Sequence, residues 1–482
     1  MAKVIMIQGT MSGAGKSLIT AGLCRLFSRE GFKTAPFKSQ NMALNSYVTF
    51  DGAEIGRAQA MQAEAAGIPA RYEINPILLK PTGHTASQVI VNGKSIGDMS
   101  AADYFSYKKS LIPVVKNAFH RLSDEFDVIV VEGAGSPAEI NLRENDIVNM
   151  GLAEILGTKV LLAGDIDRGG VFAQLIGTYT LFSEEERGRI AGFLINKFRG
   201  DKKLLDPGLV ELEKRTGIPV AGVIPYMELD LEDEDSLTDR FSRRKKAAIN
   251  ISVIKLPYIS NFTDMNTFEQ FDDVSVNYVK SPDELSLADL IVIPGSKNTL
   301  YDLRWMKEQG FNTRIKESAD TPVLGICGGF QILGNGITDN KDNEGKVFES
   351  GLGMLSVETF SLPEKKTVQS IGRIEGIKGF FSCLNGLEYE GYEIHQGVSG
   401  SGEIFCSKGN VLGSYIHGLF DKKEMSASLV NALRKRKGLQ TKSYSVTDYR
   451  EYKERQYDIL ADTLKENTDM KLVYDSMVIS DV

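Results

Sequence analysis

A glycine-rich stretch near the start of the chain has the composition of a phosphate-binding loop. It reads GTMSGAGKS at 9–17 and directly follows the apolar run VIMIQ. Gly13 and Gly15 allow backbone N–H groups to turn inward around an anion. Lys16 can reach phosphate oxygens, and the Ser17 hydroxyl can bind Mg²⁺. The usual motif places four residues between its first glycine and Gly-Lys, whereas five lie there in this chain. The stretch predicts ATP binding by a lengthened loop.

Acidic and amide side chains follow later strand candidates, at the sheet edge where ligands bind in parallel α/β folds. Glu132 ends VIVVE, and Asp165 and Asp167 lie in LLAGDIDRGG. Because Mg²⁺ prefers oxygen ligands, we expect Glu132 to join the loop serine at the metal, with Asp51 as a further candidate. Asp165 and Asp167 are either further metal ligands or acidic residues that cap a helix or stabilise a loop. Asn196, in LINKFRG, suits either an adenine edge or a turn.

The stretch VLGICGGFQILG has the layout of a nucleophile elbow, with an apolar strand, Cys327, two glycines and a helix start. Backbone N–H groups at Gly328, and at Gly295 in VIPGSKNT, are expected to form an oxyanion hole. His417, in GSYIHGLF, is the expected base that activates the thiol and then protonates the leaving group. His395, in GYEIHQG, is a second candidate. These residues predict nucleophilic catalysis by a cysteine.

Composition limits the class of protein, its partners and its compartment. The chain has 482 residues, which is enough for about three domains. Its 42% hydrophobic and 25% charged residues are ordinary for a globular protein, and a net charge of −8 argues against a nucleic-acid partner. We find no signal peptide and no apolar run of the ~18 residues that a membrane span needs. Four cysteines without a C-x-x-C pair favour the reducing cytoplasm.

Elements that can position these residues alternate between strand and helix. Apolar runs over the first 226 residues predict a doubly wound parallel α/β domain that contains the phosphate loop. Residues 227–248 are acidic and then basic, as in a solvated linker. A second α/β pattern over 249–428 contains the thiol and both histidine candidates, and 429–482 reads as a polar helical tail.

The motifs together resemble one family closely. The loop, the elbow and YIHGLF accompany three more specific stretches: FKSQNMALNS at 37–46, EIGRAQAMQAEAAG at 54–67 and NPILLKPT at 75–82. This combination resembles the cobyric acid synthase family of cobalamin-pathway glutamine amidotransferases. The N-terminal domain is similar to dethiobiotin synthetase, whose loop also carries the extra residue. The C-terminal domain is similar to the class I glutamine amidotransferase α/β domain.

The resemblance implies an ATP- and Mg²⁺-dependent amidation. Glutamine would be hydrolysed at the thiol, and the ammonia would displace phosphate from an activated carboxylate. In the family, the acceptor is adenosylcobyrinic acid a,c-diamide, which is amidated at its b, d, e and g carboxylates. Lys38 would then hold either the γ-phosphate of ATP or a carboxylate of this corrinoid, and Gln40, Asn41 and Asn45 would bind the corrinoid. The implied partners are small molecules only, in the cytoplasm, and the oligomeric state stays open.

One departure concerns the catalytic histidine. Many class I amidotransferases carry Glu two residues after it, and this chain has Leu419 there, so Glu393 is a possible substitute. Four alternatives remain. The 37–82 block argues against a cobyrinic acid a,c-diamide synthase, and Gly418-Leu419 in place of Pro-Glu argues against CTP synthase. A partitioning ATPase would carry a lysine early in its phosphate loop, and this chain has none between Gly9 and Gly15. A degenerate second domain would lack glutaminase activity.

Overall fold

The computed structural model describes residues 1–82, 86–231, 246–339 and 347–480. The chain divides into two compact units. The first contains Met1–Ala43, Ala53–Leu231 and Lys453–Val482, and the second contains Leu44–Gly52 and Glu232–Tyr452. Residues 232–245, most of the predicted linker, lie outside the described residues. The first unit therefore includes the end of the chain, and the second includes a nine-residue segment from within the predicted first domain.

A parallel sheet forms the centre of the first unit. Its main strands are β1 (Lys3–Gly9), β2 (Thr34–Phe37), β9 (Val128–Glu132), β10 (Val160–Asp165), β11 (Ile190–Phe198) and β12 (Val220–Pro225). Their order across the sheet is β12-β11-β10-β1-β9-β2. With β1 in the interior, the chain winds outward on both sides of it, which confirms the predicted doubly wound fold.

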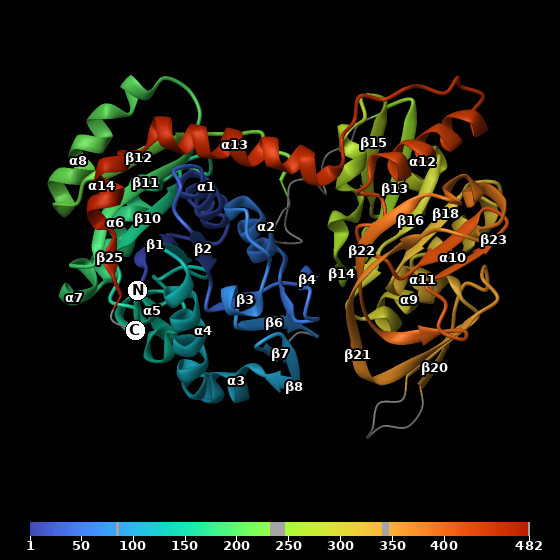
Figure 1. Cartoon of the computed structure of the whole chain (residues 1–482), viewed down its shortest axis with the longest axis horizontal. Helices are drawn as coiled ribbons and strands as arrows, with labels where there is room; N and C mark the ends of the chain where they lie inside the picture. Colours follow the sequence, from blue (N-terminus) through green and yellow to red (C-terminus); the bar gives the residue numbers. More distant parts are fainter. Residues whose placement is uncertain (83–85, 232–245, 340–346, 481–482) are drawn as a thin grey trace. The chain divides into compact units, whose positions relative to one another are not determined.

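Both faces of this sheet are buried under helices. On β1, Val4 and Met6 belong to one apolar cluster and Ile5 and Ile7 to another, because successive side chains of a strand point to opposite faces. The helices on one face are α4 (Ile112–Glu125), α5 (Met150–Ile155), α6 (Val171–Leu181) and α8 (Asp206–Thr216). Those on the other face are α1 (Lys16–Arg29), α13 (Tyr449–Asn467) and α14 (Met470–Ser476) (Figure 1).

A second, smaller sheet in this unit contains antiparallel strands. In this sheet, β7 (Ala86–Val91) pairs antiparallel with β6 (Ile77–Pro81) and β8 (Lys94–Ser100). The two-residue connection Asn92-Gly93 has positive φ at both positions, which is the geometry of a tight hairpin turn. This turn reverses the chain direction and so sets the antiparallel pairing of β7 with β8. β3 (Gln40–Met42) completes this sheet, and α2 (Arg57–Ala66) follows in the chain.

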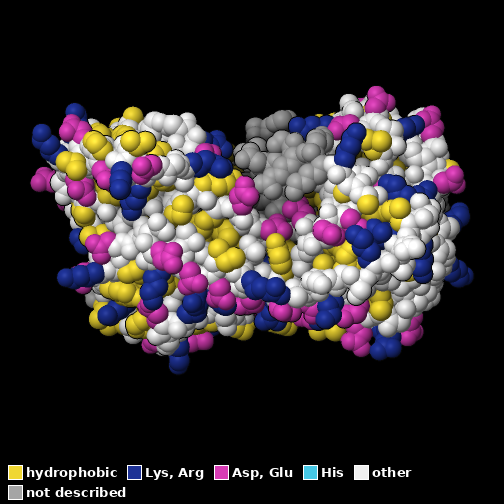
Figure 2. All heavy atoms as spheres, turned by 90° about the horizontal axis from the view of Figure 1, so that it is seen from above, with side chains coloured by type: hydrophobic (Ala, Val, Ile, Leu, Met, Phe, Trp, Pro, Cys, Tyr) yellow, Lys and Arg dark blue, Asp and Glu magenta, His cyan; other side chains and the backbone are white. Residues whose placement is uncertain are grey.

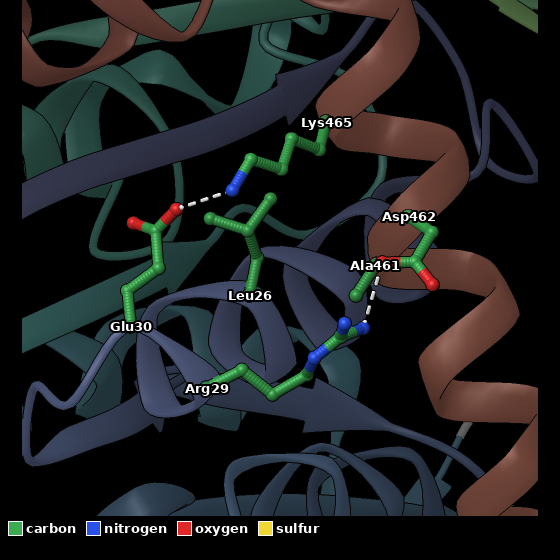
Figure 3. Close-up of a pocket in the computed structure, with 6 residues that line it drawn as sticks. All are labelled: Leu26, Arg29, Glu30, Ala461, Asp462 and Lys465. Atoms are coloured by element: carbon green, nitrogen blue, oxygen red, sulfur yellow. Dashed lines mark hydrogen bonds and ion pairs between the residues drawn. The ribbon is translucent and has the colours of Figure 1, made fainter.

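The end of the chain packs against α1. A Cβ at Gly22 would lie 2.3 Å from a Leu464 methyl group and 2.8 Å from Leu460 Cγ, so the missing side chain lets α13 pack closely against α1. Two ion pairs flank the contact and line a small surface pocket (Figure 3): Arg29 with Asp462 at 2.8 Å, and Lys465 with Glu30 at 3.0 Å. Beyond α14, β25 (Val478–Ile479) pairs antiparallel with β1. Part of the predicted tail therefore belongs to the first unit.

The second unit is built on another parallel sheet. Its strands are β13 (Ile249–Ile254), β15 (Val274–Val279), β16 (Leu290–Ile293), β18 (Val323–Ile326), β23 (Phe405–Lys408) and β24 (Val411–Ser414). Their order is β15-β13-β16-β18-β24-β23, and only β23 is antiparallel to its neighbour. The helices are α9 (Thr299–Glu308), α10 (Phe311–Glu317), α11 (Gly328–Leu333) and α12 (Lys423–Arg436). β16, β18 and β24 are adjacent, which brings together the ends of the three segments that carry the predicted thiol chemistry.

A four-stranded sheet lies beside these strands in the same unit. It contains β19 (Gly336–Asp339), β20 (Val347–Ser350), β21 (Glu358–Arg373) and β22 (Glu388–Ser399), in the order β20-β19-β21-β22.

On the surface, basic and acidic side chains are interspersed over the face shown in Figure 2. Among the described residues, every helix is too short or too polar to cross a lipid bilayer.

Candidate active sites

The phosphate loop joins β1 to α1 and relies on glycine at two positions. Gly13 and Gly15 have φ of 77° and 93°, a left-handed backbone that residues with a Cβ rarely adopt. A Cβ at Gly15 would also lie 2.1 Å from Asn196 Nδ2. Asn196 donates from Nδ2 to the Ala14 carbonyl at 2.9 Å. Asn196 thus supports the loop directly, and its predicted contact with adenine stays a prediction.

Two lysines hold the loop. Lys16 Nζ donates to the carbonyls of Met11 at 3.0 Å and Gly135 at 2.9 Å. Lys197 Nζ donates to the Gly13 carbonyl at 2.7 Å and pairs with Asp165 at 2.8 Å. Sequence reasoning missed Lys197, because a lysine near the end of a strand, here β11, carries no motif. The two ammonium groups bring positive charge to the backbone cradle that would hold phosphates.

Glu132 is the centre of a buried polar cluster beside the loop. Its side chain is fully buried at the end of β9. Oε1 accepts hydrogen bonds from Ser17 Oγ at 2.8 Å and Lys38 Nζ at 2.9 Å, and Oε2 accepts from Gln62 Nε2 at 2.5 Å. Glu132 and Ser17 therefore meet as predicted, and Lys38 and Gln62 join them. Three donors on one carboxylate offset its burial.

The other predicted metal ligands lie in different surroundings. Asp165 is buried against Lys197, and Asp167 pairs with Arg199 at 3.1 Å, so both carboxylates have cationic partners. Asp51 is exposed and accepts a hydrogen bond from Thr49 within the segment Leu44–Gly52 of the second unit. Ser17 and Glu132 are thus the metal candidates that the structure places side by side, and the part of Asp51 stays a prediction.

The predicted acceptor-binding residues divide between the two units. In the first, Gln40 Oε1 accepts from Tyr104 Oη at 2.6 Å, and Asn41 Nδ2 donates to Gln59 Oε1 at 2.9 Å. Gln59 Nε2 is buried and has no hydrogen-bond partner, so this cluster retains an unused donor. Asn45 belongs to the second unit and is almost fully buried there.

The thiol lies where a nucleophile elbow places it. Cys327 follows β18 and precedes α11, with φ of 52° and ψ of −107°. This backbone is strained for a residue with a Cβ, and such strain is common at nucleophiles on sharp turns. A Cβ at Gly329 would lie 1.9 Å from the Ile293 carbonyl, so the turn needs glycine there. Cys327 Sγ lies 3.5 Å from the Ile394 carbonyl and in contact with His417.

His417 completes the arrangement with a partner that the sequence did not indicate. His417 follows β24, and its Nδ1 lies 2.8 Å from Asp264 Oδ2. Asp264 is on the 3₁₀ helix η6 (Phe262–Gln270), and its Oδ1 accepts from the Gly418 N–H at 2.9 Å. Burial alone would lower the pKa of His417, but the Asp264 carboxylate and the Cys327 sulfur outweigh it and raise the pKa to about 10. The arrangement is a buried Cys-His-Asp triad.

Glu393 does not substitute for the missing glutamate. Its Oε2 lies 3.0 Å from His395 Nε2 and 2.7 Å from Lys366 Nζ. His395 is stacked on Tyr415 at a ring-centroid distance of 3.8 Å and contacts the Gly397 carbonyl through Nδ1. Both side chains are therefore engaged in a network apart from the triad. Successive side chains of a strand point to opposite faces, so Glu393 and His395 lie on the face of β22 opposite to Tyr392, which stacks on His417. The suggestion that Glu393 is the acidic partner of His417 is therefore wrong, and Asp264 is that partner.

The predicted oxyanion glycines lie near the triad. Gly295 is on β17 (Gly295–Ser296), and a Cβ there would lie 3.2 Å from His417 Cε1. Gly328 directly follows the thiol and opens α11, where the first N–H groups have no partner within the helix. Asp302 anchors the β17 turn by accepting from Ser296 Oγ at 2.6 Å. The role of the Gly295 and Gly328 N–H groups as oxyanion donors stays a prediction, and the positions of both glycines near the triad suit that role.

The two units define a class of enzyme: a P-loop nucleotide-binding domain joined to a glutamine amidotransferase domain. A family model for the CobQ/CobB/MinD/ParA nucleotide binding domain matches residues 5–237. A second, for the CobB/CobQ-like glutamine amidotransferase domain, matches residues 250–425.

Relatives that match over the whole chain identify the family. The cobyric acid synthase of Ruminiclostridium cellulolyticum is 50% identical over 98% of this chain and 97% of its own length. The cobyric acid synthases of Lachnoclostridium phytofermentans and Photorhabdus laumondii are 48% and 46% identical, each over at least 98% of both chains. The chain belongs to the cobyric acid synthase family, as the sequence motifs indicated.

Proposed function

We propose that this enzyme uses ATP and glutamine to convert the b, d, e and g carboxylates of adenosylcobyrinic acid a,c-diamide to amides. The observation that carries the proposal is the presence of two sites in one chain. Cys327, His417 and Asp264 form a site that can release ammonia from glutamine. Lys16, Ser17 and the glycine loop form a separate site that can bind a nucleotide. Full-length relatives named cobyric acid synthase favour this acceptor over cobyrinic acid.

The thiol site suits hydrolysis of the glutamine side-chain amide. Cys327, as thiolate, attacks the amide carbon, and N–H groups of Gly295 and Gly328 stabilise the oxyanion that develops. His417, held protonated by Asp264, gives its proton to the nitrogen as the C–N bond breaks, which releases ammonia and leaves a thioester. His417 then takes a proton from the water that cleaves the thioester to glutamate. The raised pKa of His417 keeps the imidazole protonated and ready to donate to the leaving nitrogen.

The nucleotide site suits activation of a carboxylate. Hydroxide is a poor leaving group, so phosphorylation by ATP makes the acceptor carbon open to attack by ammonia. Lys16 and Lys197 bring positive charge to the loop that would hold the phosphates.

Mg²⁺ fits the residues beside this loop. Ser17 Oγ and Glu132 Oε1 lie 2.8 Å apart, and the buried Gln62 Oε1 has no hydrogen-bond partner in the structure. Hydroxyl and carboxylate oxygens, completed by waters and phosphate oxygens, are the donors that Mg²⁺ prefers. When bound, the ion would neutralise phosphate charge during transfer. Glu132 and Ser17 would hold it, and Lys38 would then be freed from Oε1 to approach the acceptor.

Mass spectrometry of the corrinoid product tests the proposal. The a,c-diamide is incubated with ATP, Mg²⁺ and either glutamine or an ammonium salt. Four exchanges of OH for NH₂ are expected from either nitrogen source, and none with Lys16→Ala. No amidation of the a,c-diamide, or a product short of four amides at completion, would reject this acceptor. Amidation of cobyrinic acid at the a and c positions instead would favour the diamide synthase.

A further inference from the structure

The segment Leu44–Gly52 is unusually buried for a loop. It leaves β3, contains the short strand β4 (Ser46–Val48), and belongs to the second unit although the chain on both sides of it belongs to the first. Asn45, Ser46, Val48 and Thr49 are each at most 1% exposed. Loops normally lie on the surface, because buried backbone polar groups need partners. The partners of this segment lie around the catalytic histidine.

Asn45 is paired with the turn that carries Asp264. Asn45 Oδ1 accepts from the Asn261 N–H at 2.8 Å, and Asn261 Oδ1 accepts from the Ser46 N–H at 3.1 Å. Asn261 has a left-handed backbone with φ of 50° and directly precedes η6. Asp264 lies on the first turn of η6, and its N–H points back to the Asn261 carbonyl at 3.5 Å. The reciprocal Asn45–Asn261 pair therefore fixes the start of the element that orients His417.

Ser46 is linked to the other neighbour of the histidine. The Ser46 carbonyl accepts from Tyr392 Oη at 3.2 Å. The Tyr392 ring is stacked on the His417 ring at a centroid distance of 5.3 Å, and the two backbones exchange hydrogen bonds at 2.9 and 3.1 Å. Tyr47 packs edge-on against the same tyrosine at 5.3 Å. The segment thus reaches His417 from two directions, through Asp264 and through Tyr392.

We propose that the Leu44–Gly52 segment, here called the coupling segment, ties glutamine hydrolysis to occupancy of the acceptor site. This inference rests on the proposed function. Lys38, Gln40 and Asn41, the proposed acceptor residues, precede the coupling segment directly in the chain. An acceptor that reorders these residues pulls on a segment whose hydrogen bonds position both neighbours of His417. In this assignment, Asn45 is a positioning residue for the glutaminase and not a contact of the corrinoid.

The mechanism needs only small shifts. Hydrogen bonds weaken steeply as their angle and distance depart from the ideal, so a displaced Asn261 turn misaligns Asp264 with the imidazole. An acceptor can favour the aligned state only if it binds that state more tightly, and the same coupling then makes glutamine favour acceptor binding. Glutaminase turnover is therefore expected to depend on the corrinoid, whereas amidation from added ammonia is not expected to depend on the coupling segment.

The test compares glutamine hydrolysis by the full chain with and without the a,c-diamide and ATP. In the wild type, we expect the acceptor to raise glutaminase kcat about tenfold, a usual size for allosteric coupling. In Asn45→Ala, which removes the acceptor of the Asn261 N–H, the ratio should fall to within about twofold of unity. Asn45→Asp keeps that oxygen and should restore most of the ratio. Tyr392→Phe, which keeps the ring stacked on His417 and removes the hydroxyl that donates to the Ser46 carbonyl, should also lower it.

Two controls separate the possible outcomes. Phe50→Ala changes a side chain in the same segment that is 74% exposed, and should keep the wild-type ratio. Ammonia-dependent amidation reports on folding and on the proposed function, and should persist in every variant. Its absence in the wild type would reject the proposed function itself. A wild type that amidates with ammonia but hydrolyses glutamine equally with and without acceptor would overturn the coupling, as would an unchanged ratio in both Asn45→Ala and Tyr392→Phe.

Discussion

Asp264 binds His417 Nδ1 through one carboxylate oxygen at 2.8 Å and the N–H of the next residue, Gly418, through the other at 2.9 Å. A carboxylate on Nδ1 keeps a proton there and turns Nε2 toward the thiol. The Gly418 contact fixes the carboxylate itself. Leu419, at the position of the usual glutamate, is buried and apolar, so the third member of the triad comes from η6 instead.

Asp264→Asn should lower kcat for glutamine-dependent amidation by about 10²–10⁴-fold, as loss of the orienting carboxylate does in other triads. The amide cannot stabilise the imidazolium, although it has nearly the same shape. Initial rates with glutamine, compared with rates from an ammonium salt, measure the effect. Glu393→Gln is the matched control, because Glu393 pairs with His395 and Lys366. A larger loss in Glu393→Gln than in Asp264→Asn would contradict the assignment.

The pH profile of glutamine hydrolysis should change in the same variant. His417 must be protonated to donate to the leaving nitrogen, and its raised pKa keeps it so up to about pH 10. Removal of the Asp264 charge lowers that pKa, so the alkaline limb of kcat/KM should move to lower pH in Asp264→Asn. The comparison needs full profiles of both proteins. An alkaline limb that stays in place would mean that another group sets it.

Glu132→Gln should cost both stability and ligase activity. The substitution removes the charge that Lys38 pairs with at a buried site, and breaking such a pair typically destabilises by about 3 kcal/mol. Chemical denaturation measures this loss. The double variant Glu132→Gln/Lys38→Met should regain much of the stability but none of the amidation. Amidation at the wild-type rate by either variant would exclude Glu132 from the metal site.

Gly15→Ala and Gly13→Ala form a matched pair within the loop. Both glycines have positive φ, so each alanine should cost about 1 kcal/mol in backbone strain. Only at Gly15 does the new Cβ meet Asn196, at 2.1 Å, whereas nothing lies within 4 Å at Gly13. Gly15→Ala should therefore weaken nucleotide binding far more, as measured by isothermal titration. Equal losses in the two variants would show that the Asn196 contact has no influence on binding.

Local spacing made part of the site predictable. Cys327 and the loop glycines belong to turns whose geometry demands particular residues in a row, and His417 follows a recognisable strand. Asp264 shares no such pattern, because it approaches His417 from 153 residues away in the chain.

The parts that sequence reasoning missed depend on how segments fold back on one another. Lys197 and Gln62 meet the loop only after β11 and α2 have packed beside it. The assignment of Leu44–Gly52 to the second unit was equally hidden, since a polar run reads alike on a ligand surface and in a buried contact.

In the proposed function, one chain releases ammonia at Cys327 and uses it at a separate site. Amidation of the a,c-diamide by Cys327→Ala, with glutamine and with an ammonium salt as nitrogen sources, tests this most directly. We predict four amidations with the ammonium salt at nearly the wild-type rate and none with glutamine. Loss of both reactions in a variant that retains its fold and binds ATP would contradict the two-site account.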